Sequence, residues 1–99
     1  MAEYLQVFRA RVPRESVATL LAIRPAAVAE AQRLCPELLR AELVRLDDDT
    51  WLDVLTWSHA DGEQRLMRRA AEFDAVTKMH DLLSDVAEPL RGEIVHTSV

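Results

Sequence analysis

Apolar residues follow two different periods in the first third of the chain. Residues 4–12 are rich in strand-forming side chains, and Pro13 ends this segment, so we predict a strand there. Apolar positions in residues 16–34 recur at helical spacing, which predicts a helix. Pro25 lies inside that helix, so we expect either a kink at that point or a second short helix that begins near it.

The middle of the chain has the pattern of a β-hairpin. Two strand-like segments, residues 41–46 and 50–57, flank the three consecutive aspartates Asp47 to Asp49. Aspartate tolerates the backbone angles of a tight turn. Adjacent carboxylates at a turn point in different directions, and their spacing matches no Ca²⁺ loop. We therefore interpret the aspartates as a solvated turn and not as a metal site.

The last third of the chain predicts a second helix and a final strand. Apolar residues recur at helical spacing from about Asp61 to Val86, and Asp61 with a glutamine three residues later has the spacing of a capping box. The pair Phe73–Asp74 indicates a local break within this helix. Residues 93–99 predict a last short strand.

The predicted order is β-α-β-β-α-β, which is the ferredoxin-like arrangement of the α+β class. We predict a four-stranded antiparallel sheet with two helices on one face. The length of 99 residues fits one domain, which we place at residues 1–99.

The strand at residues 50–57 is largely apolar on both faces. Because side chains alternate along a strand, Trp51, Asp53 and Trp57 share one face while Leu52 and Val54 share the other. Two helices can cover only one face of the sheet, and soluble monomers rarely leave a large apolar face exposed. We therefore predict a homodimer through the sheet faces.

Composition and charge narrow the class of protein. The chain is 49% hydrophobic and 29% charged, which excludes a disordered tail. Twelve basic and seventeen acidic side chains give a net charge of −5, and this argues against nucleic acid as a partner because phosphate contacts need a basic surface. No apolar run approaches the roughly 20 residues that span a membrane. The single cysteine, Cys35, and an opening segment unlike a signal peptide lead us to expect a cytoplasmic protein.

Two tryptophans and an aspartate on one strand face are the main candidates for chemistry. Trp51 and Trp57 could stack on a flat aromatic substrate, or they could fill space between helix and sheet. Asp53 lies between them, where apolar surroundings would favour proton uptake and make it a candidate general base. Alternatively, Asp53 forms an ion pair with an arginine of a neighbouring strand. The candidates for that partner are Arg9, Arg11 and Arg45.

A histidine on the second predicted helix is a further catalytic candidate. His80 falls on the same apolar stripe as Phe73, and a histidine that faces a cleft can act as a base or proton relay near neutral pH. The alternative is a hydrogen-bonded histidine at the edge of the core. The sequence has no cysteine–histidine cluster with zinc spacing and no glycine-rich phosphate loop. We therefore predict neither a metal site nor a cofactor.

The order of elements, the hairpin LVRLDDDTWLDVLTW and the Trp57 that ends it resemble one known family. They are similar to the antibiotic-biosynthesis-monooxygenase-like proteins of the dimeric α+β-barrel superfamily, and the resemblance covers nearly the whole chain. It implies a ferredoxin-like fold, dimerisation through the sheets and a ligand cleft between helices and sheet. Activities known in the family include cofactor-independent oxygenation of polyketide-type aromatics, quinol oxidation and haem degradation.

The resemblance extends unevenly to individual residues. Trp57 corresponds to a tryptophan that often lines the family's cleft. Haem-degrading members have a histidine where this chain has Met67, and they use an asparagine in the first strand, where this chain offers Gln6, Val7 and Phe8. The whole sequence contains no asparagine, so the residues disfavour haem degradation. The side chains that we expect to bind substrate are Trp57, Trp51, Phe8, Phe73 and Met67.

These observations support two functional hypotheses. The first is a cofactor-independent monooxygenase, or a related enzyme, that acts on a small aromatic, quinol or polyketide-like molecule, with Asp53 and His80 as the catalytic residues. The second is a non-catalytic homodimer of the same fold that binds a small molecule or has a regulatory role. The fold cannot decide between them, because function depends on the site.

Overall fold

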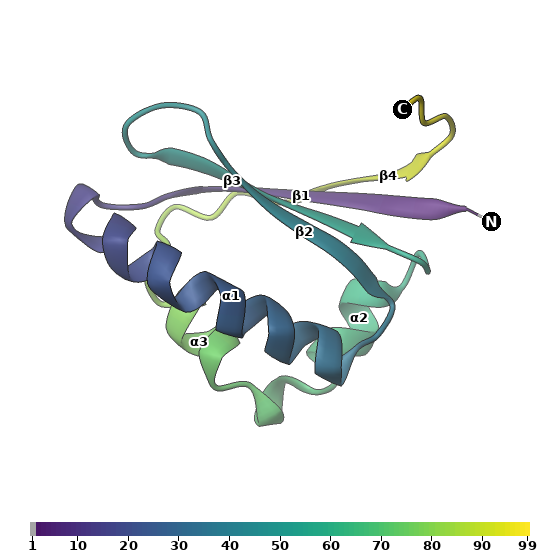
Figure 1. Ribbon diagram of the computed structural model, residues 1–99, viewed down its shortest axis with the longest axis horizontal. Coiled ribbons are helices and arrows are strands. Elements are labelled where there is room, and N and C mark those ends of the chain that lie inside the picture. Colours follow the sequence, from purple (N-terminus) through teal and green to yellow (C-terminus); the bar gives the residue numbers. More distant parts are fainter. Residues whose placement is uncertain (1) are drawn as a thin grey trace.

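The computed structural model describes residues 2–99 as one antiparallel sheet with helices on one side (Figure 1). The strand order across the sheet is β2-β3-β1-β4. This confirms the predicted ferredoxin-like α+β fold. The elements in chain order are β1 (Glu3–Arg11), the 3₁₀ turn η1 (Arg14–Ser16), α1 (Val17–Leu34), β2 (Leu38–Arg45), β3 (Thr50–Trp57), α2 (Gly62–Met67), the 3₁₀ turn η2 (Ala70–Glu72), α3 (Ala75–His80) and β4 (Leu90–Ile94).

The register of the two central strands decides which side chains face the helices. In the β1–β3 pair, Tyr4 lies opposite Trp57 and Phe8 lies opposite Asp53. Directly opposite residues share a face of the sheet, and Trp57 packs in a core cluster with residues of α1. The predicted face of β3 that carries both tryptophans and Asp53 is therefore the face beneath the helices.

Pro25 does not divide the first helical segment. The chain forms one helix of 18 residues, α1, with Pro25 inside it. A proline removes one backbone hydrogen bond from a helix interior, but the buried face of α1 continues past it, from Leu20 to Ala27 and Ala31. This face packs against the sheet on both sides of Pro25, so the chain stays helical through the proline.

The second predicted helix is interrupted, and it ends at His80 and not near Val86 as expected. The indicated break at Phe73 and Asp74 is present but is wider than these two residues, because α2 ends at Met67 and the 3₁₀ turn η2 precedes α3. Asp61 also makes no side-chain cap to α2. Its carboxylate instead pairs with Arg65, at 3.0 Å between Oδ1 and Nε.

A carboxylate from another element determines where α3 begins. Glu30 of α1 accepts hydrogen bonds from the backbone N–H groups of Asp74, Ala75 and Val76, at 3.0, 3.1 and 3.0 Å. These N–H groups belong to the first turn of α3, where they have no partner within the helix. The negative charge also lies at the positive end of the helix dipole. Glu30 therefore both restarts the helix and ties α3 to α1.

The last strand lies earlier than predicted. We expected a strand at residues 93–99, whereas β4 spans Leu90–Ile94. The reason is the register with β1, which pairs Val7 with Leu90 and Glu3 with Ile94. Since β1 begins at Glu3, the residues after Ile94 have no strand partner to continue the ladder.

The buried core consists of two separate clusters. One contains Trp57 with Ala31 and Leu34, and the other contains Trp51 with Val12 and Leu20. The two tryptophans are six residues apart on β3, which corresponds to about 20 Å along a strand. The core is therefore divided into two ends with a less tightly filled region between them.

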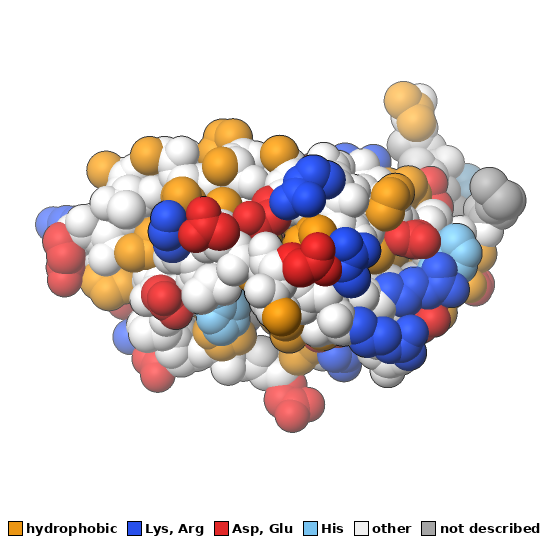
Figure 2. All heavy atoms as spheres, turned by 90° about the horizontal axis from the view of Figure 1, so that it is seen from below, with side chains coloured by type: hydrophobic (Ala, Val, Ile, Leu, Met, Phe, Trp, Pro, Cys, Tyr) orange, Lys and Arg blue, Asp and Glu red, His pale blue; other side chains and the backbone are white. Residues whose placement is uncertain are grey.

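The two sides of the molecule differ in character. On the helix side, basic side chains gather near α2 and acidic ones are spread over the surface (Figure 2). Among the described residues no helix covers the opposite face of the sheet (Figure 1), where Val44 is 38% exposed and Leu90 is 74% exposed. No helix in residues 2–99 is long and apolar enough to cross a membrane.

Replacement of Glu30 by glutamine should weaken the protein at neutral pH more than at acid pH. The pKa of Glu30 lies below its ordinary value of 4.5 because backbone N–H groups, first that of Val76, donate to its carboxylate. A lowered pKa in the folded state stabilises the protein above the unfolded pKa, and this stabilisation is lost as the pH falls through the folded value.

Urea unfolding at pH 7 and pH 3 measures the effect. We expect E30Q to have a lower midpoint than the wild type at pH 7 and the difference to shrink at pH 3. E15Q is the control, because Glu15 is an exposed acid that accepts no hydrogen bond from residues 2–99. An equal loss at both pH values would show that the ionised carboxylate does not hold α3.

Candidate functional site

A cavity of about 410 Å³ lies between the helices and the sheet. Its volume falls in the range of about 300–1,000 Å³ that is usual for small-molecule sites. All seven residues that the sequence singled out for catalysis or substrate binding line it. They are Phe8, Trp51, Asp53, Trp57, Met67, Phe73 and His80.

The two tryptophans line opposite ends of this cavity. Trp51 and Trp57 are 5% and 3% exposed, and each belongs to a different core cluster. Because they are about 20 Å apart along β3, they do not form the two sides of one ring-binding slot. Each indole instead closes one end of the cavity, and Asp53 lies between them.

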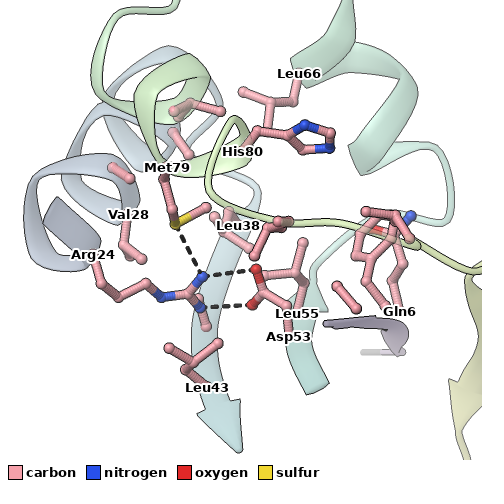
Figure 3. A pocket seen from close by; sticks show the side chains of 18 of the residues that line it. Gln6, Arg24, Val28, Leu38, Leu43, Asp53, Leu55, Leu66, Met79 and His80 are labelled. Carbon is pink, nitrogen blue, oxygen red and sulfur yellow. Dashed lines mark hydrogen bonds and ion pairs between the residues drawn. The ribbon is translucent and has the colours of Figure 1, made fainter. Parts of the chain in front are cut away.

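Asp53 is bound by an arginine that the sequence analysis did not consider. Arg24 of α1 donates from Nη1 to Oδ2 at 2.7 Å and from Nη2 to Oδ1 at 2.6 Å (Figure 3). The two side chains are 12% and 16% exposed. This two-pronged geometry is the strong form of the arginine–carboxylate contact. Each oxygen of Asp53 therefore accepts one hydrogen bond from Arg24.

The predicted partners Arg9, Arg11 and Arg45 were wrong, and strand geometry gives the reason. Arg9 pairs in register with Leu52, so its side chain lies on the face of the sheet away from the helices. The same alternation places Arg11 on that face, where it contacts Asp49. Arg45 faces the helices, but its guanidinium lies over the Trp51 ring at 4.8 Å from the centroid.

A chain of polar contacts fixes the Trp57 end of the cavity. The indole Nε1 of Trp57 donates to Oε1 of Gln6 at 3.1 Å, and Nε2 of Gln6 donates to Glu63. Arg91 of β4 in turn donates to Glu63 at 2.8 Å. Gln6, Trp57 and Glu63 also line a smaller hollow of about 260 Å³ beside β4. The network thus holds a buried amide between two hollows.

Gly62 allows α2 to approach the Trp57 ring closely. A Cβ atom at Gly62 would lie 2.4 Å from Cε3 of Trp57, which is closer than carbon atoms can pack. The missing side chain therefore sets the position of the first turn of α2 above the indole. Glu63, the next residue, is placed by the same contact.

Two of the predicted residues lie where the cavity meets solvent. His80 is the last residue of α3, and both it and Met67, which is 54% exposed, line the cavity while remaining exposed. Phe73 is half-buried beside the Trp57 cluster. The helix side of the cavity is therefore formed partly by solvent-exposed side chains.

One indole group at the other end of the cavity lacks a hydrogen-bond partner. Nε1 of Trp51 is buried and donates to no acceptor among the described residues. Buried indole N–H groups usually find a partner. Trp51 therefore contributes packing and a cation–π contact with Arg45, in contrast to the fully hydrogen-bonded Trp57.

Cys35 is buried and has the character of a structural residue. The pKa of its thiol is raised to about 11, chiefly by burial and also by the carboxylate of Glu37, which accepts a hydrogen bond from Sγ at 3.0 Å. A thiol with this pKa stays protonated near neutral pH, so it is a poor nucleophile. Within residues 2–99, His, Cys, Asp and Glu side chains form no group of three that could hold a metal ion.

Three polar residues of the site were missed by sequence reasoning, although a signal was present for two of them. Arg24 falls on the buried stripe of α1 between Leu20 and Ala27, where a charged residue needs a partner. Gln6 similarly occupies a helix-facing position of β1 and is 2% exposed. Glu63, the third, gave no such pattern, because its role depends on the close approach at Gly62.

The fold and cavity define a ferredoxin-like α+β protein, and comparison with solved structures agrees with that class. A protein from Chloroflexus aurantiacus, assigned to the antibiotic biosynthesis monooxygenases, matches with a TM-score of 0.72 and 16% identity over 98% of this chain and 97% of that chain. A variant of SnoaB, a cofactor-independent oxygenase from Streptomyces nogalater, matches with a TM-score of 0.65 and 18% identity over 98% and 95% of the two chains.

A third structure of this fold is described as a dimer. It is a dimeric ferredoxin-like protein from an uncultured marine organism, with a TM-score of 0.69 and 12% identity over 100% of this chain and 93% of that chain. No family model and no curated protein matches the sequence. At these identities the comparisons establish the fold that the chain shares with these proteins.

Substitution of Gly62 by alanine should destabilise the protein and disturb Trp57. The added methyl group would overlap the indole ring, and overpacking of this kind costs about 1–3 kcal/mol. The free energy of unfolding from urea titration measures the loss, and Trp fluorescence reports the displaced ring. G92A is the matched control, because a Cβ at Gly92 meets no atom within 4 Å. Equal stability of G62A and G92A would contradict the close approach.

Proposed function

We propose that the protein binds a small aromatic molecule in the cavity between helices and sheet and catalyses its cofactor-independent oxygenation. The observation that carries this proposal is the 410 Å³ cavity, which is walled by apolar and aromatic side chains and contains one ion pair. Similarity of fold to SnoaB and to the Chloroflexus protein supports the same reading. The substrates that fit are quinols, anthrones and related polyketide-like rings.

The reaction requires only two things of the protein, a general base and a cavity that excludes water. Removal of a proton from an anthrone-type carbon leaves a carbanion that is stabilised by the ring and its carbonyl. This carbanion reacts with O₂, the methylene becomes a carbonyl, and the second oxygen atom leaves as water. Asp53 or His80 accepts the proton, Phe8 and Phe73 line the space for the ring, and the two tryptophans close the ends of the cavity.

Binding without turnover is the second candidate function. In the structure both oxygens of Asp53 accept hydrogen bonds from Arg24, so a substrate must compete for the proposed base. A protein that holds an aromatic metabolite in this cavity and performs no chemistry on it would satisfy the same geometry. Calorimetric titration that gives tight binding of a ring compound, without oxygen consumption, would favour this function.

We further propose that the protein is a homodimer that packs sheet against sheet. The face of the sheet without helices carries apolar side chains such as Leu5, Val7 and Val54, and a neighbour of the same fold is dimeric. Burial of this face between two copies would remove apolar surface from water, which is the main driving force of association.

Oxygen consumption tests the enzymatic proposal directly. With a panel of hydroquinones and anthrones we expect uptake above the uncatalysed rate for at least one compound. D53N should lower kcat by about 100-fold or more, the size of a lost general base, and H80Q should be compared with it. D48N is the control, since Asp48 lies on the hairpin turn with a side chain 92% exposed. No uptake across the panel would contradict the proposal.

Light scattering coupled to size exclusion tests the dimer. We expect a mass near twice 11.2 kDa for the wild type at micromolar concentration. V54E places a charge at the centre of the uncovered face and should give monomers, whereas E15Q should leave the dimer intact. A monomeric wild type would refute sheet-to-sheet packing.

A further inference from the structure

We propose that Arg24 and Asp53 act as one unit that accepts a proton from the substrate and holds the resulting oxyanion. The substrate class this implies is a neutral ring compound with an acidic phenol, or with a carbonyl that becomes an enolate. The inference rests on the proposed function and assigns a role to Arg24, which neither the sequence analysis nor the comparisons singled out.

The pair lies in the cavity and keeps donors available. Two N–H groups of Arg24 bind the carboxylate of Asp53, and Nη1 also lies 3.6 Å from the sulfur of Met79 (Figure 3). A guanidinium has five N–H donors in a rigid fork. The two contacts with Asp53 therefore leave donors on Arg24 for a substrate oxygen that enters the cavity.

The charge balance of the proton transfer favours this pair. The proton leaves a C–H or O–H bond of the substrate and binds a carboxylate oxygen of Asp53, while the electron pair of the broken bond stays on the substrate and moves to its oxygen. Arg24 stays protonated throughout. Its counter-ion changes from the Asp53 carboxylate to the substrate oxyanion, so the net charge of the pair and the substrate together stays at zero.

Constant net charge matters because the surroundings are apolar. Creation of an uncompensated charge away from water is costly, and the two side chains are only 12% and 16% exposed. Among the described residues that line the cavity, Arg24 is the one arginine or lysine. The other titratable groups on the lining are Glu63, His80 and Asp81; Glu63 is held by Gln6 and Arg91, and the other two are exposed.

This mechanism predicts opposite effects for the two halves of the pair. Loss of the Asp53 charge leaves Arg24 free to bind an anion, so D53N should favour an ionised ligand. Loss of the Arg24 charge leaves an unpaired carboxylate that repels an anion, so R24M should weaken the binding of an ionised ligand. If the pair only holds α1 to the sheet, both substitutions should change the affinity for an ionised ligand in the same direction.

The test uses 4-nitrophenol, whose phenolate form absorbs visible light and whose neutral form does not. At one fixed pH, spectra of the bound probe give the phenolate fraction, and titration gives its affinity. We expect D53N to raise phenolate affinity by about tenfold or more relative to wild type and R24M to lower it by about the same factor, which is the size of one charge-assisted contact. R24K, which keeps the charge without the fork, should fall between wild type and R24M.

The controls use an ion pair of the same composition on the surface. Arg14 and Asp48 lie 3.8 Å apart with side chains 86% and 92% exposed, so R14M and D48N should leave the phenolate affinity unchanged. If R24M does not fold, the phenolate affinities of D53N and R24K are compared with that of the wild type instead.

Three outcomes separate this inference from the proposed function. Shifts of the same sign in D53N and R24M or R24K, or no binding of 4-nitrophenol to the wild type, overturn the role of the pair. Opposite shifts without oxygen consumption by the wild type would support the pair as an oxyanion site and reject the oxygenase. Opposite shifts together with oxygen consumption that R24M loses support both.

Discussion

The two-pronged contact between Arg24 and Asp53 is the constraint around which the interior is arranged. It joins the middle of α1 to the middle of β3, between a core cluster at Trp51 and another at Trp57. Two charged groups with little access to water must stay together, because separation would leave each uncompensated. The pair therefore holds α1 over the sheet at a point where apolar side chains do not fill the space, and the cavity surrounds it.

The ends of the cavity are held by contacts that tie the short helices to more regular elements. Glu30 of α1 binds the first turn of α3, and Gly62 lets α2 rest on the Trp57 ring. Helices of six residues have little stability of their own, so these contacts decide where their side chains lie. His80 and Met67 owe their places at the cavity to them. Part of the cavity wall is thus formed by short helices of low intrinsic stability, which specific contacts hold in place.

Periodicity predicted the parts of the fold that depend on local pattern, and missed those that depend on partners far away in the sequence. β3 was found with its boundaries, and the alternation along it placed Trp51, Asp53 and Trp57 on the face that lines the cavity. Arg24 was missed, although its position on the buried stripe of α1 was a signal. The break before α3 was indicated at Phe73 and Asp74, but the contact that fixes it could not be foreseen, because Glu30 lies more than forty residues earlier in the chain. The place of β4 likewise follows from its register with β1.

The central claim is that the space around Arg24 and Asp53 receives an aromatic ring. A crystal structure of the protein soaked with 1,8-dihydroxyanthrone measures this most directly. The account predicts the ring between the Trp51 and Trp57 ends of the cavity, with one of its oxygen atoms within hydrogen-bonding distance of the Arg24 guanidinium. A cavity closed by its own side chains, or a ring bound only on the outer surface, would contradict it.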